Sequence, residues 1–244
     1  MTKEKIALFW SGGKDSALAL YRLLKEDKYQ VVYLVTTINQ NFKRISMHGV
    51  REELLDQQGH SLDIPLLKMY VDEASNSAYE KQLEFVFKKL KSENIFKVAF
   101  GDIFLEDLKE YRDQKLLNSG MQGIYPLWKN DTKKLIAEFL SLKFKTITCC
   151  VNDAYFSERD AGVEITGEWI NNLPGDVDPC GENGEYHTFC YDGPIFKKPV
   201  KFTIGEKIYK PLQLNLNDDS PDIITRGFWF CDLIAEVPFN SDRI

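Results

Sequence analysis

The segment that most constrains this 244-residue chain is its beginning, where a short apolar run meets two glycines. Residues 6–16 read IALFWSGGKDS. The apolar run over 6–9 is typical of a buried strand in a parallel sheet, and the apolar residues between Ala17 and Leu24 recur at helical spacing. The glycine pair therefore predicts a strand, a turn and a helix in immediate succession.

A strand, a glycine turn and a helix in this order form a place to hold phosphate. Gly12 and Gly13 let the main chain approach an anion closely, and the N–H groups of the first helical turn point toward it. Lys14 adds a positive charge, while Ser11 and Ser16 add hydroxyl groups.

The same segment has a simpler interpretation. Ser11 can cap a helix whose first turn carries Asp15 and Ser16, which is a common way for a helix to begin. A Walker loop is excluded, because Leu8 stands where that motif has its first glycine, and the letters do not spell GxGxxG. Both remaining interpretations start a helix directly after the glycine pair.

The first 151 residues alternate between strand and helix patterns. Strands are predicted over 30–35, 65–69, 97–100, 123–125 and 146–151, helices over 50–58, 76–93, 106–118 and 132–142, and a polar loop over 36–47. Such alternation predicts an α/β fold with a doubly wound, mostly parallel sheet, which binds its ligand at the carboxyl ends of its strands. The polar residues expected to join the glycine turn at that edge are Thr36, Thr37, His48, Gly101 and Asp102.

Beyond residue 151 the character of the sequence changes. A helix predicted over 164–172 precedes a stretch rich in glycine and proline, and strand patterns return near 200–204 and 228–237. We therefore expect two domains: a phosphate-binding α/β domain over 1–151 and a smaller α+β domain with antiparallel strands over 152–244, on the side of the substrate.

The composition narrows the classes of partner. A net charge of −6 argues against bulk binding to nucleic acid, and no apolar run approaches the length of a membrane span. The start of the chain shows no export signal, so we expect a cytoplasmic protein. The five cysteines lack metal-binding spacing and are expected to be thiols.

A second chemically rich stretch, residues 180–194, reads CGENGEYHTFCYDGP. Glu182 and Glu185 can offer carboxylates to Mg²⁺ or to an amine, and His187 can offer an imidazole to a substrate. The alternative is a hairpin, because Asn183-Gly184 is a favoured pair for a tight turn, and the carboxylates would then be merely solvated. The local chemistry leaves both interpretations open.

The letters SGGKDS after an apolar strand resemble the signature of the PP-loop ATP pyrophosphatases. Together with GDI at 101–103, PLW at 126–128 followed by Asp131, and GENGEYHTF with DGPIFKK, they are similar to the diphthine–ammonia ligase family. The resemblance extends from about residue 5 to about residue 200. The spelling VDPCGENGEYHTF is closer to bacterial relatives of that family.

Two stretches depart from the family pattern. SMH at residues 46–48 is similar to a family stretch that is one residue longer and lies at the adenosine pocket. In the helix after Gly101 the family shows Arg, any residue and Glu, whereas this chain has Tyr111, Arg112 and Asp113.

The resemblance implies a PP-loop fold and a two-step reaction. A substrate carboxylate attacks the α-phosphorus of ATP, pyrophosphate leaves with the help of Mg²⁺, and ammonia then displaces AMP to give an amide. The residues expected to act in catalysis are Lys14, Asp15, Glu182, Glu185 and His187. Those expected to contact the nucleotide are Ser11, Gly12, Gly13, Lys14, Asp15, Ser16, Thr36, His48, Gly101 and Asp102.

The resemblance leaves the acceptor open. It is either a protein side chain, on elongation factor 2 in a true diphthine ligase, or a small carboxylate, and free ammonia is expected as the nitrogen donor because no glutaminase domain is visible. Two other functions remain possible: a PP-loop enzyme that adenylates a tRNA base, and a sensor that holds ATP without turnover. The negative net charge and the irregular cysteine spacing argue against the tRNA-modifying enzyme. Metal ligands and oligomeric state are not assigned.

Overall fold

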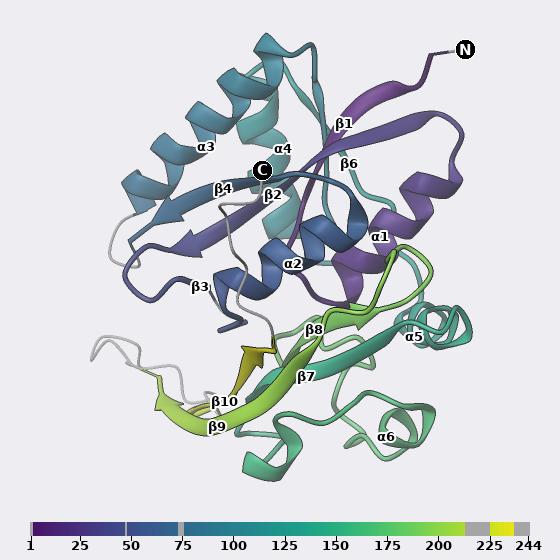
Figure 1. The fold of residues 1–244 in the computed structure, drawn as a ribbon, viewed down its shortest axis with the longest axis vertical. Coiled ribbons are helices and arrows are strands. Elements are labelled where there is room, and N and C mark those ends of the chain that lie inside the picture. Colours follow the sequence, from purple (N-terminus) through teal and green to yellow (C-terminus); the bar gives the residue numbers. More distant parts are fainter. Residues whose placement is uncertain (1, 47, 73–75, 213–224, 237–244) are drawn as a thin grey trace.

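The structure, a computed structural model, describes residues 2–46, 48–72, 76–212 and 225–236. It contains two sheets that lie one above the other in Figure 1. The expected α/β fold, a mostly parallel sheet with a smaller C-terminal lobe, is confirmed. None of the helices in these described ranges is long and apolar enough to cross a membrane.

The first sheet has six strands and is parallel except for one short strand at its edge. Its elements are β1 (Glu4–Phe9), β2 (Tyr29–Asn39), β3 (Arg44–Ile45), β4 (Leu66–Val71), β5 (Lys97–Ala99) and β6 (Gln122–Ile124). β1 lies between β2 and β5; β4 and β6 extend the sheet outward in parallel pairs, and β3 pairs with the end of β2 in the antiparallel sense. The strand order reverses at β1, which is where doubly wound sheets bind their ligands.

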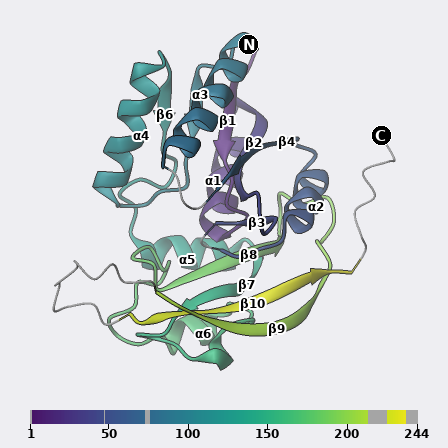
Figure 2. The ribbon, with the colours of Figure 1, turned by 90° about the vertical axis from the view of Figure 1, so that its left-hand side faces the viewer.

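Helices cover both faces of this sheet. Because successive side chains of a strand point to opposite faces, Ile6 and Leu8 join one core and Ala7 joins the other. The first core includes α1 (Lys14–Lys25) and α2 (Glu52–Leu62), and the second includes α3 (Asn76–Ser92) and α4 (Glu106–Asn118). Figure 2 shows α4 and α2 on opposite sides of the strands. Burial on both faces explains the continuous apolar run of β1.

The second sheet is antiparallel, in the order β8-β7-β10-β9. Its strands are β7 (Lys145–Asn152), β8 (Tyr186–Asp192), β9 (Phe202–Pro211) and β10 (Gly227–Ala235), accompanied by α5 (Thr132–Ser141) and α6 (Gly167–Asn171). The expectation that residues 146–151 complete the parallel sheet is wrong, because this strand pairs with β8 and β10. A short apolar run fits a buried strand of either sheet, so its pattern does not reveal its neighbours.

Most element predictions are confirmed to within a few residues, but four differ. The strand predicted near 200–204 is too short, because β9 continues as far as Pro211. The predicted polar loop over 36–47 begins too early, because β2 continues beside β4 as far as Asn39. α6 is shorter than the predicted helix, and the predicted strand over 228–237 ends outside the described residues. The second sheet starts at Lys145, before the expected domain boundary at residue 151, and that boundary stays a prediction.

Ion pairs join the two lobes beside α2. Asp232 on β10 accepts hydrogen bonds from Arg51 Nε and Nη2 at 2.9 and 2.7 Å, and from Arg44 Nη1 at 2.8 Å. The hydrogen bond from Arg51 is the main reason that the pKa of Asp232 falls to about 2. Because this geometry is bidentate and charge-assisted, it fixes one lobe against the other.

Candidate functional site

The turn between β1 and α1 admits only glycine at Gly12. Its φ is +76°, in the left-handed region, and a Cβ there would lie 2.8 Å from Gln58 Oε1. Gly101, after β5, has a similar steric role, since a Cβ there would lie 3.1 Å from main-chain atoms of Asp15 and Ser16. Two backbone segments therefore approach the start of α1 closely.

α1 begins with Gly13 in the N-cap position, and this residue has no side chain that could cap the helix. Ser11 Oγ accepts a hydrogen bond from Gly13 N at 3.3 Å, and Ser16 Oγ donates to Gly13 O at 2.9 Å. The interpretation that Ser11 caps the helix is therefore wrong. A helix that starts at the end of a buried strand presents its positive end to an anion.

The second lobe holds this turn in place through β8. Cys190 N donates to Gly12 O at 2.8 Å, and Lys14 N donates to Thr188 Oγ1 at 3.0 Å. The glycine turn is thus packed between the two sheets, although its hydrogen-bond partners on β8 are more than 170 residues away in the chain.

Gln58 connects the turn and β8 from within α2. Its side chain is fully buried; Nε2 donates to Gly12 O at 3.0 Å and to Cys190 O at 2.6 Å, and Oε1 accepts from Trp10 Nε1 at 2.8 Å. Sequence reasoning missed this residue, because a glutamine inside an amphipathic helix carries no signal that it is buried.

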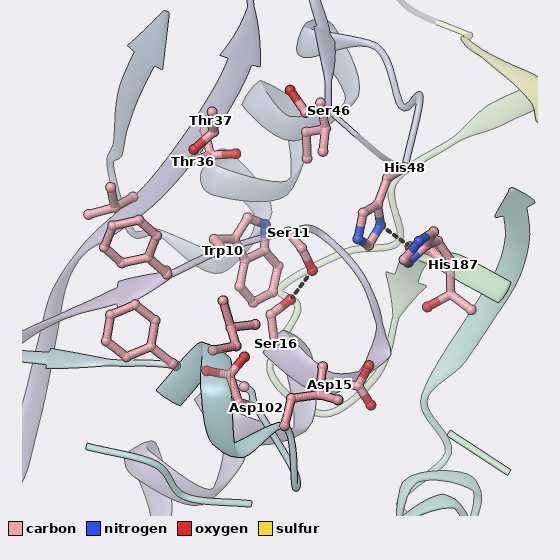
Figure 3. Close-up of a pocket in the computed structure, with 18 of the residues that line it drawn as sticks. Trp10, Ser11, Asp15, Ser16, Thr36, Thr37, Ser46, His48, Asp102 and His187 are labelled. Atoms are coloured by element: carbon pink, nitrogen blue, oxygen red, sulfur yellow. Dashed lines mark hydrogen bonds between the residues drawn. The ribbon is translucent and has the colours of Figure 1, made fainter. Parts of the chain in front are cut away.

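A cavity of about 630 Å³ lies at the ligand-binding edge of the first sheet and is bounded on its other side by the second lobe (Figure 3). This volume is in the range of small-molecule and cofactor sites. The predicted site residues that line it are Ser11, Lys14, Asp15, Ser16, Thr36, His48, Gly101, Asp102, Glu182 and His187. The structure therefore brings these residues together around one cavity, while Gly12, Gly13 and Glu185 do not line it.

Lys14 provides a buried positive charge at this cavity. Its side chain is almost inaccessible; Nζ donates to both carboxylate oxygens of Asp15, at 3.0 and 2.8 Å, and to Cys180 O. Burial is the largest single influence and lowers the pKa of Lys14, but Asp15, Tyr186 and Cys180 together outweigh it, so the pKa is raised. Lys14 therefore stays charged at every physiological pH.

Glu182 is an acid that ionises near neutral pH. Its carboxylate accepts hydrogen bonds from Ile103 N at 2.8 Å and Phe104 N at 3.4 Å. Burial, followed by repulsion from Asp15, raises the pKa of Glu182 to about 7. A carboxylate with such a pKa can take up and release a proton near neutral pH, as a general base must.

Two imidazoles lie side by side on one wall of the cavity (Figure 3). The rings of His48 and His187 are 4.6 Å apart between centroids, and His48 Nδ1 lies 3.2 Å from Thr188 O. Burial lowers the pKa of His48 to about 4, and burial together with His48 and Lys14 lowers the pKa of His187 well below its usual value. Both rings are therefore neutral, and His187 Nε2 is buried with no hydrogen-bond partner among the described residues.

Glu185 organises the loop that carries Glu182. It is 1% exposed, and its carboxylate accepts hydrogen bonds from Asp178 N, Asn183 N and Asn183 Nδ2 at 2.9, 2.9 and 3.1 Å. The hairpin alternative is wrong, because β8 pairs with β7 and the described residues just before Asn183 form no strand. A catalytic role for Glu185 stays a prediction.

Arg112 is a cavity residue to which the sequence assigned no role. It lies on α4, forms an ion pair with Asp102, and its guanidinium lies 4.6 Å from the centroid of the Phe100 ring. Sequence reasoning noted only its departure from the family pattern. The packing of α4 decides which of its side chains face the cavity. The sequence of this hydrophilic helix does not reveal that packing.

The cavity has separate carboxylates rather than a dedicated metal cage. In the part of the chain that the structure describes, no group of three or more His, Cys, Asp or Glu side chains is arranged to hold a metal ion. Asp15, Asp102 and Glu182 line the cavity individually. Of the three-residue stretch at 46–48, Ser46 and His48 line the cavity, and Met47 lies outside the described residues.

Comparison with known families decides how this site is classified. Models of the diphthamide synthase N-terminal domain and of the diphthamide synthase C-terminal domain match residues 4–123 and 131–214. The chain belongs to the diphthamide synthase family. The first of its two domain models covers nearly all of the parallel sheet, and the second begins just before α5.

Similar curated members of the diphthamide synthase family are named diphthine–ammonia ligases. The protein of Schizosaccharomyces pombe is 23% identical over 221 residues, which make up 81% of this chain but 36% of the yeast protein. The protein of Rattus norvegicus is 24% identical and that of Danio rerio 22%, with 85% and 86% of their lengths covered. The chain thus spans about a third of the yeast relative and most of the animal relatives. The predicted family is confirmed, and with it the enzyme class, an ATP-dependent ligase that forms carbon–nitrogen bonds.

Proposed function

We propose that this enzyme activates a carboxylate with ATP, releasing pyrophosphate, and then converts it into an amide with ammonia, releasing AMP. The observation that carries the proposal is the composition of one cavity. The start of α1 and the buried Lys14 stand on one side, and Glu182 and His187 of the second lobe stand on the other. One side suits phosphates, and the other suits proton transfer.

The first step requires stabilisation of the leaving pyrophosphate. An oxygen of the substrate carboxylate forms a bond to the α-phosphorus, and the bond between that phosphorus and the oxygen bridging to the β-phosphate breaks. Pyrophosphate leaves with the electron pair. Lys14 and the N–H groups at the start of α1 stabilise the developing negative charge. A carboxylate is already a nucleophile at neutral pH, so no activated serine or cysteine is needed.

The remaining lining fits the rest of a nucleotide. Thr36 is 1% exposed, and its Oγ1 has no hydrogen-bond partner within the described ranges. Such a buried hydroxyl costs free energy unless a ligand binds it. Together with the hydroxyls of Ser11 and Ser16 and the neutral ring of His48, it supplies uncharged contacts for the nucleotide.

The carboxylates of Asp15 and Asp102 fit Mg²⁺ at a nucleotide site. This ion is usually held by one or two carboxylates together with substrate phosphates, rather than by an all-protein cage. We assign it to these two residues, whose negative charges already pair with Lys14 and Arg112. When bound, Mg²⁺ neutralises charge on the phosphates.

The second step requires free ammonia, because ammonium has no lone pair. Glu182, with a pKa of about 7, is suited to take a proton from ammonium, whereas the lowered pKa of the neutral His187 makes it a weaker base. The ammonia nitrogen then attacks the acyl carbon of the adenylate. The carbon–oxygen bond to the phosphate breaks, AMP leaves with the electron pair, and the nitrogen releases one proton to solvent to give the neutral amide.

The relatives suggest the first acceptor to test. They are named diphthine–ammonia ligases, so the carboxylate of diphthine on elongation factor 2 is the leading candidate, and a small free carboxylate is the second. The test incubates the enzyme with ATP, Mg²⁺, isotope-labelled ammonium and each acceptor, and measures AMP, pyrophosphate and labelled amide. Pyrophosphate release that needs an acceptor, with label in the product, supports the proposal.

Three results would argue against it. Pyrophosphate release that depends on tRNA would indicate a base-adenylating enzyme, ATP binding without any release would indicate a sensor, and production of ADP would contradict the bond that we assign for cleavage. Glu182→Gln and Glu185→Gln form a matched pair. Glu182→Gln should keep ATP binding and lose amide formation. If Glu185 is purely structural, Glu185→Gln should instead lower the stability of the protein.

A further inference from the structure

A second cavity, of about 270 Å³, lies beside the first. Ile45, Ser46 and His187 line both, so the two cavities share a wall. The second is bounded by the end of β2 and by β3 on one side and by strands of the second sheet on the other. None of the residues expected to contact the nucleotide lines it.

The size and the walls of this second cavity suit a group of side-chain size. Its volume equals that of about nine water molecules at roughly 30 Å³ each, which is too small for a nucleotide. The walls are mainly apolar and include Phe42, Phe228 and Phe230. Phe42 is 62% exposed and Cys150 is 1% exposed, so the cavity runs from a mouth at the surface to a buried end.

The charges at the second cavity favour an anion. Its described lining contains Arg44 and Lys210 and no carboxylate. Arg44 is paired with Asp232, whereas Lys210 forms no ion pair within the described residues. Lys210 Nζ lies 5.7 and 5.0 Å from the ring centroids of Phe42 and Phe230, so a positive charge stands among the aromatic walls.

Two buried polar atoms at the second cavity lack partners in the described part of the chain: Asn39 Nδ2 and His187 Nε2. Asn39 is 2% exposed, and its Oδ1 is used by the turn that follows β2, where it accepts from Asn41 N and Phe42 N at 2.9 and 3.1 Å. Its amide N–H groups therefore remain for a ligand. Buried donors without partners are rare, and a carboxylate oxygen would satisfy this one.

We propose that this second cavity binds the body of the carboxylate acceptor: an apolar or aromatic group of side-chain size, whose carboxylate lies at the wall formed by His187. The inference deepens the function proposed above and rests on it, because the shared wall brings such a carboxylate next to the nucleotide cavity. Lys210 attracts the anion to the mouth, and Asn39 hydrogen-bonds to it. A side chain on a protein and a free small molecule can both enter through the exposed mouth.

The direct test measures binding of phenylacetate, which combines an aromatic body with a carboxylate, to the full chain by calorimetry. Phenylacetamide, which lacks the charge, is the control ligand. We expect phenylacetate to bind more tightly than the amide and to remain bound when a non-hydrolysable ATP analogue saturates the first cavity. Displacement by the analogue, equal affinity for the amide, or no binding would overturn the inference.

Asn39→Asp tests the proposed hydrogen bond and the ligand's charge. The variant keeps an oxygen for Asn41 N and Phe42 N but replaces the amide donor with a second carboxylate oxygen. Phenylacetate affinity should fall at least tenfold. The control Asn41→Asp makes the same change at an exposed residue that lines neither cavity, and should alter affinity less than twofold. Equal effects of the two variants would overturn the inference, as would tighter binding to Asn39→Asp. Phe42→Ala, at the exposed mouth, should also weaken binding if Asn39→Asp fails to fold.

Turnover experiments separate this inference from the proposed function and distinguish the two sources of acceptor. Phenylacetate should inhibit competitively against whichever acceptor supports AMP formation, the protein-borne or the free carboxylate, and Asn39→Asp should raise the KM for that acceptor. If the enzyme forms AMP with an unchanged acceptor KM in Asn39→Asp, the inference fails and the proposed function stands. If no acceptor supports AMP formation while phenylacetate still binds as expected, the proposed function fails and the carboxylate site is supported.

Discussion

Replacing Glu182 with glutamine should remove a pH dependence from the stability of the protein. Burial and the nearby Asp15 raise the pKa of Glu182 from an ordinary 4.5 to about 7, so the folded protein binds one more proton than the unfolded chain between these values. The wild-type free energy of unfolding therefore contains a contribution that is present below pH 4.5 and is lost as the pH rises through 7. The difference between the two pKa values corresponds to about 3 kcal/mol.

The assay is urea unfolding of the wild type and of Glu182→Gln at pH 4.5 and at pH 7.5. The side-chain oxygen of glutamine can still accept from Ile103 N, so the comparison changes mainly the titrating group. The difference in unfolding free energy between the wild type and the variant should fall by about 3 kcal/mol between the two pH values, because titrating groups that do not interact with Glu182 cancel in this difference. A difference that does not change with pH, or that grows as the pH rises, would refute the environment assigned to Glu182.

Three further changes test the site and its support. Lys14→Ala should lower the rate of pyrophosphate release by roughly 10²–10³, the effect of losing one donor that stabilises transition-state charge, and a loss below about tenfold would reject that role. Gln58→Leu should lower the free energy of unfolding by about 3 kcal/mol, because Trp10 Nε1 and Cys190 O lose a buried partner, whereas a change under about 1 kcal/mol would show that the site relaxes around leucine. Asp232→Asn should abolish a contribution of about 2 kcal/mol to the free energy of unfolding, which in the wild type is present above pH 4 and lost as the pH falls toward 2. Acid unfolding of the variant that matches that of the wild type would contradict this prediction.

Local chemistry made the first sheet and its ligand edge predictable. The apolar run before Gly12 and the helical spacing after it define a strand, a turn and a helix without reference to any other part of the chain. The positions after β1 and β5 could then be placed together, because parallel strands end at the same edge. Lys14 and Asp102 line one cavity as this reasoning requires.

Long-range pairing was not predictable in the same way. β7 has the composition of a buried strand, but only its partners β8 and β10 reveal that it belongs to the second sheet. The contacts of Gln58 with Gly12 and Cys190 join elements that are far apart in the sequence, so no local sequence pattern predicts them. The burial of Glu185 likewise depends on how its own loop folds back on it, which a turn signal such as Asn183-Gly184 does not specify.

The central claim is that the glycine turn and the start of α1 hold the outer phosphates of ATP, so that the bond between the α- and β-phosphates is the one that breaks. A crystal structure of the enzyme with an ATP analogue that cannot be cleaved at this bond tests it most directly. The account predicts the β- and γ-phosphates at the N–H groups of the turn, within hydrogen-bond distance of Lys14 Nζ. Phosphates bound away from the turn, or a γ-phosphate turned toward His187 with the α-phosphate at Lys14, would contradict it.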